Sequence, residues 1–65
     1  MSKFIELKTT AGTRRFVNIN NISAIVDIDP GYSCLVYFSG DDYFKTIKTY
    51  DEVVAIIKQE LRENE

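Results

Sequence analysis

Histidine is absent from this chain of 65 residues, and cysteine and proline occur once each. A single cysteine excludes an internal disulfide, and the lack of histidine excludes a His/Cys metal site of the kind that binds zinc. Glycine and proline are too few for a disordered chain, and the hydrophobic fraction of 45% is ordinary for a globular domain. We therefore expect a globular domain with no metal and no other cofactor.

Long apolar runs are absent as well. The residues from Met1 to Glu6 lack the apolar segment of a signal peptide, and no run approaches the length of a membrane-spanning helix. These absences predict a reducing cytoplasmic setting and no membrane partner. The net charge of −2 makes nucleic acid an unfavourable partner, because affinity for nucleic acid rests on Lys and Arg contacts with phosphates.

The length of the chain predicts a single domain covering residues 1–65. A chain of this size buries only about 60% of its unfolded surface, so its core is small. Association with a second copy is a common way for such a chain to bury more apolar surface. We therefore expect a homo-oligomer or binding to another protein.

One stretch near the C-terminal end has the pattern of an amphipathic helix. Thr49 precedes Glu52 by three residues, the spacing of a capping box, in which each side chain bonds the backbone N–H of the other residue. Apolar residues follow at steps that place them on one helical face: Tyr50, Val53, Ile57 and Leu61. Valine and isoleucine are mediocre helix formers, so this face is expected to be buried.

Upstream of the helix, apolar and polar residues alternate in five short segments separated by turn-forming residues. The predicted strands are 4–8, 13–18, 22–29, 34–39 and 43–48. Asparagines at 18, 20 and 21 predict a single helical turn or a tight bend after the second strand. The predicted fold class is α+β: a five-stranded antiparallel β-meander, twisted or partly rolled, with one C-terminal amphipathic helix packed on one face.

The same alternation predicts the core. The residues expected to be buried together are Ile5, Leu7, Val26, Val36, Val53, Ile57 and Leu61. The residues in the opposite strand phase are Phe4, Ile25, Leu35, Tyr37 and Phe44. On a monomer they would form the contiguous exposed apolar patch that monomers generally avoid. Either a symmetric homodimer or a sheet rolled into a small barrel would cover them, and the homodimer is the prediction.

Few groups are candidates for chemistry. Cys34 lies within the strand alternation, and no histidine can activate it, so it is expected to be a small buried hydrophobic residue rather than a nucleophile. Aspartates at 27, 29, 41 and 42 lie near turns, and turn capping accounts for them better than paired-carboxylate catalysis or Mg²⁺ binding. The sequence therefore predicts no catalytic residues and no enzyme.

Aromatic and basic residues are interleaved along the predicted strands: Arg14, Arg15, Phe16, Tyr37, Tyr43, Phe44 and Lys45. Such side chains form subunit interfaces, and they also form the stacking surfaces that bind single-stranded nucleic acid. Strand propensity alone would place aromatic residues there too. The candidate interaction surface comprises Phe4, Arg14, Phe16, Ile25, Leu35, Tyr37 and Phe44, and a protein interface is the preferred interpretation.

A set of residues spread over nearly the whole chain, most of them core, turn or cap residues, carries a family resemblance. They are Ile5-Glu6-Leu7, Gly12, Phe16-Val17, Ile22, Ile25-Val26-Asp27, Pro30, Val36, Gly40 and Thr49-Tyr50-Asp51-Glu52-Val53. In these positions the chain loosely resembles the small FlbD/SwrD-type proteins associated with bacterial flagella and swarming. The segments 30–33 and 40–42 look longer than the usual turns of that family. The resemblance implies a bacterial protein and supplies no catalytic residues.

A second, weaker likeness rests on the Ile-x-x-Ile segment from Ile22 to Ile25, on Tyr32 in a turn, and on the helix from Tyr50 to Leu61. In these features the chain resembles LytTR-type DNA-binding domains, which are longer and more basic. Taken together, the sequence predicts a small cytoplasmic protein-interaction or regulatory module without catalytic activity. The alternative is a nucleic-acid-binding small β domain, either LytTR-like or of the stacking-surface type.

Overall fold

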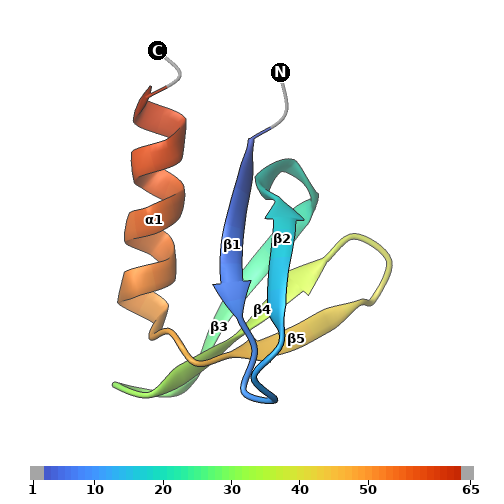
Figure 1. Cartoon of the computed structure of the whole chain (residues 1–65), viewed down its shortest axis with the longest axis vertical. Coiled ribbons are helices and arrows are strands. Elements are labelled where there is room, and N and C mark those ends of the chain that lie inside the picture. The colour runs from blue at the N-terminus through green and yellow to red at the C-terminus, as the bar shows by residue number, and fades with distance from the viewer. Residues whose placement is uncertain (1–2, 64–65) are drawn as a thin grey trace.

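The computed structural model describes residues 3–63. Its elements follow the predicted order (Figure 1). They are β1 (Phe4–Lys8), β2 (Arg14–Asn18), the short 3-10 helix η1 (Ile19–Asn21), β3 (Ile22–Asp29), β4 (Ser33–Phe38), β5 (Tyr43–Thr46) and α1 (Tyr50–Glu63). The α+β class and the C-terminal helix are therefore confirmed.

The strands form two antiparallel sheets, so the prediction of one five-stranded meander is wrong. β1 pairs with β2, and β3, β4 and β5 form a separate sheet in that order. The reason lies in η1, where the Asn18 side chain accepts a hydrogen bond of 2.9 Å from the backbone N–H of Asn20. This turn redirects the chain, so β3 leaves β2 instead of pairing with it.

The two sheets meet at one corner, where the end of β1 reaches the end of β5. Thr9 and Thr46 form an isolated antiparallel bridge. The backbone N–H of Ile47 and the hydroxyl of Thr46 both donate to the carbonyl of Lys8, at 3.1 and 2.8 Å. Thr46 is fully buried, and these bonds satisfy its hydroxyl.

The capping box of α1 is present as predicted. The backbone N–H of Thr49 donates to Glu52 Oε1 at 2.9 Å, and the backbone N–H of Glu52 donates to Thr49 Oγ1 at 3.2 Å. The helix runs alongside β1 (Figure 1). It reaches the core through buried Val53 and through Ile56 and Ile57, which are partly buried.

The core lies between the two sheets and the helix. Its buried apolar residues are Ile5, Leu7, Val17, Ile19, Cys34, Val36, Phe44 and Val53. Two members of the predicted core are instead exposed: Val26 by 40% and Leu61 by 48%. Leu61 lies one helical turn beyond Ile57, past the part of α1 that contacts the core.

Val26 is exposed because β3 is irregular. The register of β3 against β4 shifts between Ile22 and Ala24, and this β-bulge reverses the strand phase. Ile25 then pairs with buried Val36, while Val26 pairs with Leu35 on the other side of the sheet. A simple alternation carried along β3 therefore assigns Ile25 and Val26 to the wrong faces.

Candidate interaction surfaces

An open groove of about 530 Å³ lies beside β2. One wall is formed by Phe4 and by residues 15–18 of β2, and the other by Asn21, Phe38, Ser39 and Asp42. We call this the β2 groove. Residues 15–18 in its first wall belong to β2, which lies on the side of the β1–β2 hairpin away from α1 (Figure 1).

The hairpin presents an exposed aromatic pair at the groove. The rings of Phe4 and Phe16 stack with centroids 5.1 Å apart and an interplanar angle of 16°. Phe16 pairs with Glu6 in the register, on the face opposite to buried Ile5 and Leu7. Phe16 is 71% exposed, so most of its apolar surface faces water.

Arg15 has the opposite orientation, because it pairs with buried Leu7 and so turns toward the core face. Its guanidinium carbon lies 4.7 Å from the centroid of the Phe44 ring and 5.6 Å from that of Phe38. These two rings stack on each other with centroids 5.5 Å apart. The position of Arg15 is therefore fixed by cation–π contacts.

Asp42 completes this part of the groove. Gly40 and Asp41 both have positive φ, 86° and 71°, which makes the turn between β4 and β5 tight. The turn closes with a 2.7 Å bond from the N–H of Phe38 to the carbonyl of Asp42. An Asp42 carboxylate oxygen then lies 4.0 Å from the Arg15 guanidinium, which is longer than a hydrogen bond.

A second exposed surface is the side of the three-stranded sheet that faces away from the core, which we call the outer sheet face. Tyr37 pairs with Tyr43, and their rings stack with centroids 5.2 Å apart. Leu35 lies between Val26 and Lys45 in the register. Val26 is 40% exposed and Tyr43 is 55% exposed, so this face is apolar and open to water.

The predicted interaction residues thus do not form one surface, because they lie at the β2 groove, on the outer sheet face and in the core. Phe4 and Phe16 lie together at the β2 groove, and Leu35 and Tyr37 lie together on the outer sheet face. Arg14 is exposed on the hairpin. Ile25 packs against the core and Phe44 belongs to it, so their predicted place in the exposed set is wrong.

The groove residues missing from the predicted surface are Arg15, Val17, Asn18, Asn21, Phe38, Ser39 and Asp42. Arg15 alternates in phase with Val17, which is a signal that it faces inward. The turn residues come from a segment far away in the sequence, and no local pattern marks them.

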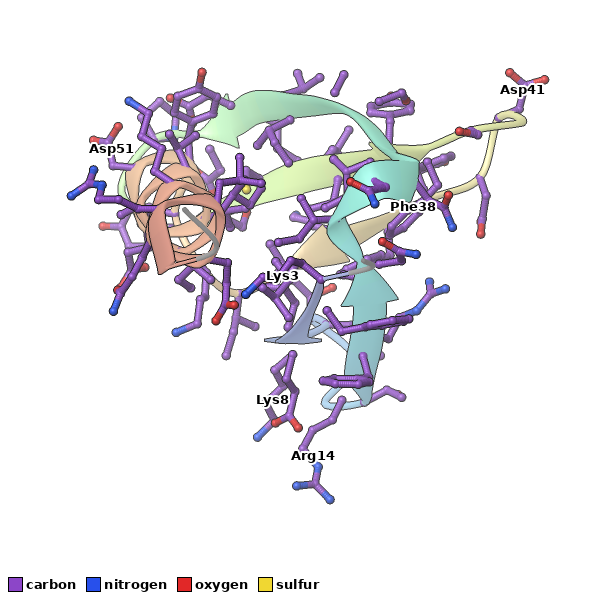
Figure 2. All side chains as sticks on the ribbon, turned by 90° about the horizontal axis from the view of Figure 1, so that it is seen from above. Lys3, Lys8, Arg14, Phe38, Asp41 and Asp51 are labelled. Carbon is purple, nitrogen blue, oxygen red and sulfur yellow. The ribbon has the colours of Figure 1, made fainter. Side chains whose placement is uncertain are left out.

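Charge is distributed unevenly over the molecule. Four cations and one anion, Glu6, give residues 1–18 a formal charge of +3, although the whole chain carries −2. Figure 2 shows Lys8 and Arg14 projecting together from the hairpin, while Asp41 and Asp51 lie at the opposite ends of the molecule. The hairpin is therefore a basic surface on an acidic protein.

Cys34 is fully buried, as predicted. Burial raises the pKa of its thiol, and the nearby negative charge of Asp27 raises it further. The thiol is therefore protonated and shielded. Among the side chains that the structure describes, those of residues 3–62, no group of three His, Cys, Asp or Glu is arranged to hold a metal ion. Across the same residues, no helix is long and apolar enough to cross a membrane.

Comparison of the chain with protein-family models, with curated proteins and with solved structures finds no match.

Proposed function

We propose that this protein is a small cytoplasmic protein-interaction or regulatory module without catalytic activity. The observation that carries the proposal is the exposure of two separate apolar surfaces on so small a chain. These are the Phe4–Phe16 pair at the β2 groove and the outer sheet face around Tyr37 and Tyr43. Exposed apolar patches on folded proteins commonly mark interaction sites.

The proposal that the module is not an enzyme is supported by the structural roles of two groups, in the described part of the chain, whose pKa values are shifted. Glu52 is engaged in the helix cap, and Cys34 is buried as a neutral thiol. Both shifts have a structural cause, whereas catalytic sites shift the pKa of groups that can reach a substrate.

The proposed self-association uses the outer sheet face. Its apolar residues Val26, Leu35, Tyr37 and Tyr43 repeat across neighbouring strands, with Lys45 beside them. A face with so few charges has no electrostatic reason to reject a copy of itself. A two-fold pairing of two such faces would bury the tyrosine stacks of both copies.

Sedimentation equilibrium over a range of protein concentrations tests this proposal. We expect the wild-type chain to shift toward the dimer mass as concentration rises. Val26→Glu should keep it monomeric, because a carboxylate would then have to be buried in the pairing. Phe16→Glu adds the same charge outside this face and serves as the matched control. A wild-type chain that stays monomeric throughout contradicts the homodimer.

Nucleic acid binding is the second candidate function, and the basic hairpin with its exposed Phe4–Phe16 stack is the observation that favours it. Stacking surfaces flanked by Lys and Arg bind single strands with strong salt dependence. We expect no specific complex. Titration of the protein with an oligothymidylate tests this expectation. Phe16→Ala is the suitable variant because Phe16 is exposed, whereas Phe44, the other candidate stacking residue, is part of the core. A salt-sensitive complex lost in Phe16→Ala would support this second function.

The FlbD/SwrD-type resemblance suggests that the interaction serves flagellar assembly or swarming. The resemblance rests on core, turn and cap positions, so it supports the fold more than the role. The genes adjacent to the one encoding this chain test the role directly. Flagellar neighbours would support it, and phage or mobile-element neighbours would contradict it.

A further inference from the structure

The edge of β2 that faces away from β1 carries unpaired backbone groups. At the two ends of the hairpin, the N–H of Thr9 donates to Thr13 at 2.7 Å and the N–H of Ile19 donates to Lys3 at 2.8 Å. Bonded and non-bonded pairs alternate along an antiparallel ladder. The residues of β2 that bond to β1 are therefore those at 15 and 17.

The backbone N–H and C=O groups of Phe16 and the N–H of Asn18 consequently point outward from the hairpin. Asn18 is the N-cap of η1, so its carbonyl accepts the first hydrogen bond of that helix. Within residues 3–63, β2 has no strand partner other than β1, and none of the backbone bonds that leave the strands engages Phe16. The outward edge borders the β2 groove, since residues 15–18 form one of its walls. An extended peptide in this groove could therefore form backbone hydrogen bonds with the outward edge of β2.

Arg15 supplies a fixed cation in the same groove. Its guanidinium is held over Phe44, and the 4.0 Å separation from Asp42 leaves the pair without a hydrogen bond. Within residues 3–63, the Arg15 side chain makes no hydrogen bond at all. A guanidinium has five N–H donors and matches the geometry of a carboxylate.

Charge complementarity identifies the occupant. The hairpin that provides the edge, residues 4–18, has a formal charge of +2 from Lys8, Arg14, Arg15 and Glu6. A second copy would bring the same basic edge, so Arg14 and Arg15 of the two copies would repel each other across an edge-to-edge pairing. An acidic extended segment would be attracted instead.

We propose that the β2 edge binds an extended, acidic and partly apolar segment of a partner protein as an additional strand. Backbone bonds to Phe16 and Asn18 align the segment, and a carboxylate of the segment bonds Arg15. An apolar side chain of the segment packs on the Phe4–Phe16 pair. This inference rests on the proposed role as an interaction module and names the class of its partner.

The geometry favours a peptide over a nucleic acid at this place. A strand edge offers alternating N–H and C=O groups, which an extended peptide backbone matches. Phe4 and Phe16 already stack on each other, so a base would have to use the remaining exposed face of Phe16.

The test uses the full chain, labelled with ¹⁵N, and a short capped peptide of alternating glutamate and valine. A lysine–valine peptide of the same length is the matched probe. We expect the glutamate peptide to shift the amide signals of Phe16 and Asn18, and added salt to weaken the binding. Arg15→Gln should weaken it about tenfold, and Lys58→Gln, which removes the same charge from α1, should leave it unchanged.

Two substitutions at Phe16 separate backbone from side-chain contacts. Phe16→Pro removes the outward N–H without removing a bond to β1, and proline is tolerated on edge strands at such positions. Phe16→Ala keeps that N–H and removes only the ring. We expect binding to be lost in the proline variant and retained in weakened form in the alanine variant. If the proline variant fails to fold, the amide shifts of the wild-type chain and the affinity of Arg15→Gln for the glutamate peptide test the proposal.

Several results would overturn the inference. They are equal binding of both peptides, amide shifts confined to the outer sheet face, an absence of any shift, and tighter binding of an oligothymidylate at β2. If the chain self-associates but neither peptide binds, the proposal of an acidic peptide partner is contradicted and the proposed interaction module is retained. Loss of both self-association and peptide binding would remove the proposed function as well.

Discussion

Arg15 shows how one long side chain serves both the fold and the surface. Its guanidinium lies over the rings of Phe38 and Phe44 at the open end of the core. Phe44 is only 8% exposed, and part of that shielding comes from a charged residue. The fold therefore holds a cation at the surface with little remaining freedom, which is the condition for precise recognition of an anion.

The capping box of α1 likewise depends on two single residues, because it consists of the two hydrogen bonds between Thr49 and Glu52. Thr49→Ala should lower the free energy of unfolding by roughly 1 kcal/mol, measured as the shift of the urea midpoint. Thr10→Ala, in an exposed turn, is the control. An unchanged midpoint in Thr49→Ala would show that the cap contributes nothing.

The cap also predicts a pH dependence. The bond from the Thr49 N–H, aided by the Thr49 side chain, holds the pKa of Glu52 below its ordinary value of 4.5. The folded state thus favours the carboxylate, so its stabilisation is complete above the ordinary pKa and is lost as the pH falls through the lowered one. Urea midpoints across this range should fall less in Glu52→Gln than in the wild type. Parallel pH profiles would contradict the assignment.

At the scale of elements, α1 contributes through one short part of its length. Val53 is fully buried, whereas Leu61 on the same helix is 48% exposed. Val53→Ala should therefore lower the free energy of unfolding by about 1–3 kcal/mol through lost burial and a residual cavity. Leu61→Ala is the control and should change it by less than about 0.5 kcal/mol. Similar urea midpoints for the two variants would mean that α1 docks differently.

The elements also show where prediction from sequence succeeds and fails. The capping box, the strand segments and the bend at Asn18 to Asn21 are local, and residues adjacent in the chain carry enough information to predict them. The division into two sheets depends on which strands meet, which adjacent residues do not encode. The bulge in β3 inverted the faces of Ile25 and Val26, because a one-residue shift changes the side of the residues that follow, here up to the second shift between Val26 and Asp29.

The candidate surfaces follow the same logic. Phe4 and Phe16 were both placed in the candidate interaction surface, and both are exposed, because regular alternation holds in β1 and β2. Phe44 was misassigned because strand phase alone does not tell which side of a short strand faces the core. The groove itself joins β2 to the β4–β5 turn, and only the three-dimensional arrangement brings them together.

At the scale of the whole molecule, the two proposed surfaces differ in their chemistry. The outer sheet face is apolar, and the β2 groove is basic as well as apolar. Self-association should therefore persist or strengthen as salt is added, since salt does not screen apolar burial. Peptide binding at β2 should weaken under the same conditions. Sedimentation and peptide titration at matched ionic strengths measure both responses, and a parallel salt dependence would contradict the division.

The corner between Thr9 and Thr46 has a consequence for how the domain holds together. Each hairpin pairs neighbours in the chain, but this bridge closes a loop that spans most of the domain. Closing so long a loop has a large entropic cost, and an isolated two-strand hairpin is marginal in water. Both sheets contribute to the same core, so neither would keep a core of its own if the Thr9–Thr46 bridge were broken. The β1–β2 hairpin and the three-stranded sheet are thereby made one cooperative unit.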